Sequence, residues 1–183
     1  MNRNRPHPLT IAAGVAVFGL VLAATGLDLR LAADHWEEMG PLAPGDELPE
    51  FRARTLEGEL FDNATLEGQV SVLTFWATWC GACSREMPVL EELHGEYADR
   101  GVVLYGVNTD RDPEQETLAR DYVTERGLNF PVVLDTGRVR QGFRVSMLPH
   151  LALVDRNGRL RYVHQGTVGK GTLRREIESL LSE

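Results

Sequence analysis

Hydrophobic residues follow two different periods along this chain, and the alternation between them predicts the order of its secondary structure. Residues 69–76 (QVSVLTFW) and 102–107 (VVLYGV) are nearly continuous apolar runs rich in β-branched residues, which are typical of buried strands. Between them, apolar residues recur at Met87, Leu90 and Leu93, the spacing of one helical face. The three segments together predict a βαβ unit.

The rest of the chain repeats this alternation. Asn157-Gly158, which lies between two short apolar runs, is the strongest short-range signal for a β-hairpin. The predicted elements are a helix over 113–126 with Leu118 and Tyr122 on its apolar stripe, a strand over 131–134, a helical turn to Gly142, a hairpin over 151–163, and a last helix with Leu173, Ile177, Leu180 and Leu181 on one face. This order predicts an α/β fold in which a central mixed β-sheet is flanked by helices on both faces.

An uncharged segment of nineteen residues, Leu9–Leu27, lies near the N-terminus between Arg3 and Arg5 on one side and Asp28 on the other. A helix of that length extends about 28 Å, close to the thickness of a bilayer core. The preceding arginines predict that this end stays in the cytoplasm. We therefore expect a transmembrane signal-anchor that leaves the rest of the chain exported.

A cleaved signal peptide is the alternative interpretation of this segment. Val21-Leu22-Ala23 lies inside the apolar run, and Leu31-Ala32-Ala33 has leucine where a small residue is needed, so both are poor cleavage sites. Residues 28–49 lack a sustained apolar period and carry three prolines, which predicts a tether that ends near Pro44. The expected organisation is a cytoplasmic N-terminus (1–8), an anchor (9–27), a tether (28–43) and one folded domain (44–183).

Charge and cysteine content exclude several classes of protein. The chain has 183 residues and a formal net charge of −8, and from residue 28 onward seventeen basic residues face twenty-seven acidic ones. An exported body this acidic repels phosphate backbones, which makes nucleic acid an unsuitable partner. Two cysteines are too few for a disulfide-stapled scaffold or a zinc site built mainly of thiolates.

The two cysteines are Cys80 and Cys83, and they fall where the first predicted strand passes into its helix. Free backbone N–H groups and the positive dipole end at a helix N-terminus stabilise an anion, which lowers the pKa of the first thiol. Cys80 is therefore predicted to be the nucleophile, and Cys83, one helical turn away, the resolving thiol. The alternative is two unrelated buried thiols or half of a metal site, although His94, His150 and His164 are scattered.

The segment Phe75–Cys83 (FWATWCGAC), followed by Glu86-Met87-Pro88, resembles the active-site segment of the thioredoxin superfamily. Within that superfamily it is most similar to the TlpA and ResA-like membrane-anchored thiol-disulfide oxidoreductases. The resemblance runs from about Pro44 to the C-terminus. It implies a thioredoxin-like fold with a TlpA-type N-terminal extension and a central βα insertion over residues 131–142.

The resemblance also implies which residues surround the dithiol. Pro149 stands where the superfamily has a cis-proline facing the cysteines, and the backbone of Leu148 would pair with an extended substrate segment. Trp79 would add an aromatic surface for protein partners. His150 stands where the family usually has threonine; it is expected either as a surface imidazole or as a residue that contacts substrate or tunes the site.

Two further positions bear on proton transfer. Thr74 occupies the place of a buried aspartate that relays protons in ordinary thioredoxins, so that relay is missing. Glu86 matches a glutamate that ResA-like proteins keep beside the dithiol. A carboxylate there would raise the pKa of the thiols and could accept the Cys83 proton. The alternative is that Glu86 only complements the helix N-terminus.

The expected function is a protein-disulfide reductase that needs no cofactor and no metal. The Gly81-Ala82 pair lacks the histidine that strongly oxidising relatives place before the second cysteine, which favours a reductant. The resemblance implies a single-pass protein of the bacterial inner membrane with its catalytic domain on the periplasmic or outer side. It further implies a transmembrane thiol donor of the DsbD or CcdA type and, as substrates, apocytochrome c or copper-site protein cysteines.

Two other functions remain open at this point. A peroxiredoxin-like peroxide reductase would share the fold, but such enzymes carry Thr or Ser three residues before the reactive cysteine, where this chain has Ala77. A non-enzymatic copper carrier could use Cys80, Cys83 and His150 as soft ligands. However, related copper carriers space their cysteines by three residues rather than two.

Overall fold

The computed structural model describes residues 20, 21, 23 and 42–183. The chain divides into two units, Met1–Gly40 and Pro41–Glu183. In the first unit Leu20, Val21 and Ala23 are helical, and the rest of the predicted anchor and nearly all of the predicted tether lie outside the described residues. Among the residues described, no helix has both the length and the apolar character needed to cross a membrane.

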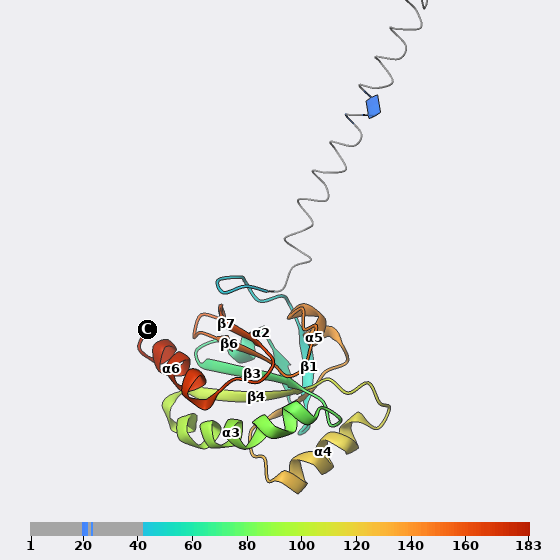
Figure 1. The fold of residues 1–183 in the computed structure, drawn as a ribbon, viewed down its shortest axis with the longest axis vertical. Helices are drawn as coiled ribbons and strands as arrows, with labels where there is room; N and C mark the ends of the chain where they lie inside the picture. The colour runs from blue at the N-terminus through green and yellow to red at the C-terminus, as the bar shows by residue number, and fades with distance from the viewer. Residues whose placement is uncertain (1–19, 22, 24–41) are drawn as a thin grey trace, which may run out of the picture. The chain divides into compact units, whose positions relative to one another are not determined.

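Strands of the second unit form one mixed sheet in the order β2-β1-β5-β4-β3-β6-β7 (Figure 1). Their bounds are β1 Arg52–Thr55, β2 Leu60–Asp62, β3 Val70–Trp76, β4 Val102–Asn108, β5 Val132–Leu134, β6 His150–Val154 and β7 Leu160–Gln165. β3, β4 and β5 run parallel, whereas β6 and β7 on one side and β1 and β2 on the other pair antiparallel. The predicted α/β class with a central mixed sheet is confirmed.

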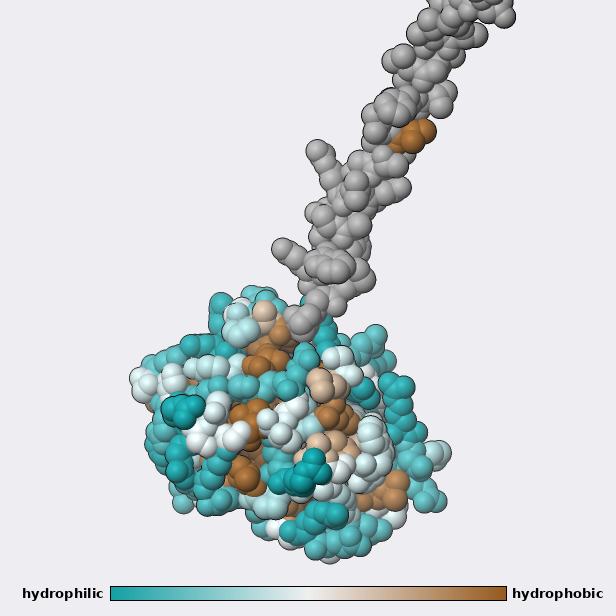
Figure 2. Space-filling model, viewed as in Figure 1, coloured by the Kyte–Doolittle hydropathy of each residue, from teal (hydrophilic) through white to brown (hydrophobic). Residues whose placement is uncertain are grey.

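Helices cover both faces of this sheet (Figure 1). They are α2 Asn63–Leu66, α3 Gly81–Tyr97, the 3-10 helix η1 Ala98–Arg100, α4 Gln115–Arg126, α5 Arg138–Gly142 and α6 Lys170–Leu181. The apolar faces of α3, α4 and α6 share one hydrophobic cluster with alternate residues of the central strands, among them Val72, Trp76 and Leu151. The other alternate residues, including Leu73 and Phe75, form a second cluster with Val139 of α5. The face of the second unit that is drawn in Figure 2 is mostly hydrophilic, with separate smaller hydrophobic patches.

The register of the sheet brings distant segments to the cysteines. β3 and β6 are antiparallel, and Phe75 of β3 pairs with His150 of β6. Pro149, which precedes His150, therefore lies at the end of β3 from which the Cys80 loop leaves. β4 ends beside β3 as well, because Trp76 pairs with Asn108 in the parallel register. The dithiol is thus framed by the cis-proline segment and by the residues after β4.

Sequence periodicity located most elements but not all of them. The hairpin β1–β2 and the short helix α2 carry no clear period, because strands of three or four residues are too short to show one. In α4 the buried residues are Ala119 and Tyr122, whereas Leu118 is half-buried. The predicted stripe is therefore right at Tyr122, whereas Ala119 rather than Leu118 is the buried residue one turn before it.

Candidate functional site

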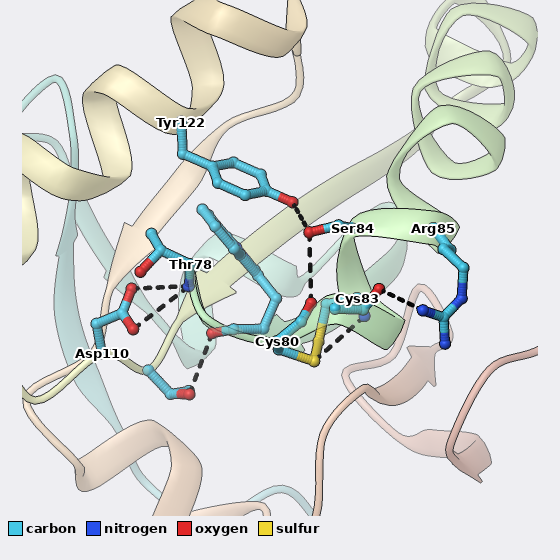
Figure 3. Close-up of a disulfide and its surroundings, with 10 residues drawn as sticks. Thr78, Cys80, Cys83, Ser84, Arg85, Asp110 and Tyr122 are labelled. Atoms are coloured by element: carbon cyan, nitrogen blue, oxygen red, sulfur yellow. Dashed lines mark hydrogen bonds between the residues drawn. A yellow bond between two sulfur atoms is a disulfide. The ribbon is translucent and has the colours of Figure 1, made fainter.

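The two cysteines form a disulfide at the N-terminus of α3, with Cα atoms 5.3 Å apart (Figure 3). Cys80 is the N-cap residue, and its Sγ accepts a hydrogen bond from the Cys83 backbone N–H at 3.2 Å. A sulfur anion at Cys80 would receive the same N–H bond and the positive end of the helix dipole. The disulfide confirms the predicted pair and excludes two unrelated thiols.

The two cysteines differ in exposure. Cys80 keeps 6% of its surface exposed, whereas Cys83 keeps 1% and lies on the inner side of α3. A protein substrate therefore reaches Cys80 first. This geometry supports the predicted roles of nucleophile and resolving thiol, which remain predictions.

The loop that carries Cys80 is held by Asp110, which follows β4. The backbone N–H of Thr78 donates to both carboxylate oxygens of Asp110, at 3.0 and 3.3 Å (Figure 3). Asn108 donates its side-chain amide to the same carboxylate at 2.9 Å. Asp110 is 4% exposed, so these bonds lie in a protected environment. Sequence reasoning missed Asp110, which lies two residues after the end of β4.

A second support comes from α4. The Tyr122 hydroxyl donates to Ser84 Oγ at 2.8 Å, and the Ser84 hydroxyl in turn donates to the Cys80 carbonyl oxygen at 3.4 Å (Figure 3). The Tyr122 ring also packs on Trp76, with centroids 4.6 Å apart. Tyr122, predicted only as a core residue, therefore also fixes the first turn of α3.

The Leu148–Pro149 peptide bond is cis, as the resemblance implies. Leu148 is half-buried and packs against both hydrophobic clusters, including the one that contains the cysteines. Two large apolar side chains beside these segments face solvent. Trp79, which precedes Cys80, is 72% exposed, and Met147, which precedes Leu148, is 47% exposed. Sequence reasoning named Trp79 but missed Met147. A role for Trp79, Leu148 and Pro149 in substrate docking stays a prediction.

Glu86 lies one turn beyond Cys83 on the buried side of α3, with 4% of its surface exposed. Its Oε1 accepts the Val168 backbone N–H at 2.8 Å, while Oε2 has no hydrogen-bond partner among the described residues. Burial raises the pKa of Glu86, and the Val168 N–H and the nearby His164 oppose that rise. The role of proton acceptor for Glu86, and the alternative that it complements the helix N-terminus, both stay predictions.

Thr74 of β3 and His150 of β6 are both buried polar residues of the central sheet. Thr74 is fully buried in β3, and its hydroxyl has no partner among the described residues, in keeping with the loss of the aspartate relay. His150 is 1% exposed, so the expectation of a surface imidazole is wrong. Its ring packs edge-on against the Phe75 ring, with centroids 5.6 Å apart, on the sheet face opposite α3.

Burial lowers the pKa of His150 to about 4, so the imidazole is neutral near pH 7. A substrate docked at the dithiol does not reach this ring, which counts against His150 as a substrate-binding side chain. Within the described part of the chain no three His, Cys, Asp or Glu side chains are grouped as metal ligands. The predicted copper set of Cys80, Cys83 and His150 is accordingly not assembled.

Comparison with known proteins places this geometry in a family. The family described as Redoxin matches residues 43–181. The chain belongs to the Redoxin family. The thiol-disulfide oxidoreductase ResA of Geobacillus thermodenitrificans is 32% identical over 162 residues, which cover 88% of this chain and 91% of that protein.

Solved structures agree with this assignment. A structure assigned as the thiol:disulfide interchange protein DsbE from Chlorobium tepidum has a TM-score of 0.70 and 28% identity, and the match covers 76% of this chain and 99% of that one. DsbF of MTB, solved in mixed oxidized and reduced forms, has a TM-score of 0.64 and 31% identity, covering 71% and 94%. Together with the Cys80–Cys83 disulfide, these relatives support a thioredoxin-like thiol-disulfide oxidoreductase that acts on protein disulfides.

Proposed function

We propose that this Redoxin family member is a membrane-anchored reductant of disulfides in exported proteins. The observation that carries the proposal is the position of Cys80, whose sulfur caps α3 and accepts the Cys83 N–H while remaining the more exposed of the two. That arrangement suits a thiolate that attacks a partner's disulfide.

The reaction proceeds by two exchanges. The Cys80 thiolate attacks one sulfur of the substrate disulfide, forming a mixed disulfide and releasing the first substrate thiolate. Cys83 then loses its proton and attacks Cys80 Sγ, which releases the second substrate thiolate. The substrate gains two electrons and two protons, and the chain gains the Cys80–Cys83 disulfide.

Glu86 is the proposed proton acceptor for Cys83. It lies one turn along the same helix face, and its Oε2 has no partner among the described residues. Burial raises its pKa, which brings that pKa closer to the pH at which the protein works and makes the group a better general base. In its ionised form it also opposes ionisation of the thiols, which favours the disulfide form and therefore reduction of the partner.

The direction of electron flow is tested by an equilibrium measurement. Oxidised and reduced protein are quantified in dithiothreitol and glutathione redox buffers of known ratio, with Cys80→Ser as a blank. We expect a reduction potential nearer to about −270 mV, as in thioredoxin, than to about −120 mV, as in DsbA. A value near that of DsbA would make the chain an oxidant and contradict the proposal.

Electrons have to cross the membrane to reach an exported reductase. A transmembrane thiol relay of the DsbD or CcdA type is the proposed donor, because it would return the Cys80–Cys83 disulfide to the dithiol by the same exchange chemistry. The proposed acceptors are cysteines of apocytochrome c or of copper-site proteins. A reductase in an oxidising compartment needs such specific targets, because unselective reduction would open structural disulfides.

The proposed location is the bacterial inner membrane, with residues 9–27 as an uncleaved anchor and the catalytic domain on the periplasmic or outer side. A reporter that is active only outside the cytoplasm, fused after Glu183, is expected to be active and to stay with membranes after a salt wash. Recovery of a soluble, shortened fusion would instead identify the segment as a cleaved signal peptide.

A further inference from the structure

An arginine-rich hollow of about 830 Å³ lies between the start of α4 and the segment that leads to the cis-proline. Its lining includes Arg111, Arg138, Arg140 and Arg144. We refer to this feature as the arginine hollow. It is separate from the dithiol and takes no part in the exchange steps described above.

The arginine hollow adjoins both segments that frame the cysteines. Asp110 in its wall holds the backbone N–H of Thr78, two residues before Cys80. Val145 and Ser146, also in its wall, lead directly into Met147-Leu148-Pro149. A polypeptide whose disulfide lies at Cys80 therefore has its flanking residues within reach of the arginine hollow.

The charge of the arginine hollow contrasts with that of the domain. Residues 42–183 contain sixteen basic and twenty-three acidic side chains, yet four arginines line this one hollow. Arg111 and Arg138 are exposed, and neither forms an ion pair with a residue that the structure describes. They are available to an external anion.

Three aspartates also line the arginine hollow, and their oxygens are largely engaged. Asp135 accepts hydrogen bonds from the backbone N–H groups of Gly137, Val139 and Arg140, and Asp110 accepts from Thr78 and Asn108. Both carboxylates are buried, at 3% and 4% exposed. Asp112 is exposed and caps the following turn through the Glu114 N–H. Four arginines against three aspartates leave the lining with a net positive charge, and two of the cations, Arg111 and Arg138, are exposed against one exposed anion, Asp112.

We propose that the arginine hollow selects substrates whose target disulfide is flanked by acidic residues. This inference rests on the proposed function and names the substrate class for the same dithiol. Guanidinium groups bind carboxylates through paired, charge-assisted hydrogen bonds. A local basic site on an acidic domain also orients an acidic segment toward the dithiol, because the rest of the surface repels it.

Two synthetic peptides test this selection. Both carry the same intramolecular disulfide, one flanked by glutamates and the other by glutamines at the same positions. Their single-turnover reduction by the reduced full chain is measured at low and high salt, and each rate is divided by that of dithiothreitol with the same peptide. We expect the glutamate peptide to react about tenfold faster at low salt, with the ratio falling toward one at high salt.

Matched variants locate the effect. The double variant Arg111→Gln, Arg138→Gln is expected to bring the glutamate-to-glutamine rate ratio close to one. The control Arg159→Gln, Arg175→Gln removes the same charge from exposed positions outside the arginine hollow and is expected to keep the wild-type ratio. Equal wild-type rates for the two peptides, or an equal loss in the control, would overturn the inference alone. Failure of the wild type to reduce either peptide would overturn the proposed function itself.

Discussion

Cys83→Ser is expected to turn the chain from a catalyst into a trap that stays covalently attached to its substrates. Cys80 remains at the N-terminus of α3 and still attacks a disulfide, but a serine hydroxyl does not displace the resulting mixed disulfide. Turnover with a disulfide-bonded substrate is expected to fall by at least about 100-fold, in line with the loss of other members of a catalytic unit. Non-reducing gels and mass spectrometry detect the adducts.

Cys80→Ser is the matched control for this experiment. Cys83 is 1% exposed, so it is expected to form almost no adducts when it is the remaining thiol. Equal amounts of adduct in the two variants would contradict the assignment of roles. Performed in cells, the Cys83→Ser trap also identifies the partners, and apocytochromes or copper-site proteins among them would support the proposed acceptors.

Glu86→Gln is expected to slow the resolution of a preformed mixed disulfide by about 10- to 100-fold near neutral pH, because a general base is removed. The apparent pKa of the dithiol should fall at the same time, since a carboxylate no longer opposes thiol ionisation. Stopped-flow fluorescence measures resolution, and pH-dependent alkylation measures the pKa. Glu92→Gln is the control, because Glu92 is an exposed acid on the same helix. Wild-type behaviour of Glu86→Gln in both assays would exclude Glu86 as the base.

The pH dependence of the free energy of unfolding provides an independent check on the raised pKa of Glu86. Burial raises its pKa in the folded protein above 4.5, so the folded state holds this proton more tightly than the unfolded state. Its contribution to the free energy of unfolding is therefore greatest below pH 4.5 and declines as the pH rises through the raised pKa. The free energy of unfolding of Glu86→Gln minus that of the wild type, measured by chemical denaturation, should therefore rise with pH over that window. The difference between the two proteins isolates Glu86 from His150, which titrates in an overlapping range.

The parts of the fold and site that depend on local pattern could be predicted from sequence. β3, α3 and β4 each bury a long apolar run or stripe, and the Cys80-Gly81-Ala82-Cys83 spacing places both sulfurs on one helical turn whatever surrounds them. The cis bond before Pro149 was predicted through resemblance rather than from residue chemistry. These features depend on contacts that are close in the chain or on a shared motif.

The features that were missed or wrongly predicted from sequence depend on contacts between distant segments of the chain. Asp110 reaches Thr78 across 32 positions, and no local pattern at Asp110 indicates that partner. His150 is buried because β6 pairs with β3, which brings the imidazole against Phe75 from a distant part of the chain. The burial of Glu86 also depends on a distant segment, because the loop before α6 covers it through Val168. Each of these outcomes required the packing of the whole sheet.

The most direct test of the central claim is the identity of the first covalent intermediate. Reduced wild-type protein is mixed with a disulfide peptide, quenched with acid within the first turnover and mapped by mass spectrometry. We predict a transient peptide adduct on Cys80, followed by the Cys80–Cys83 disulfide and one fully reduced peptide per chain. An unchanged peptide disulfide, or an adduct that forms first on Cys83, would contradict it.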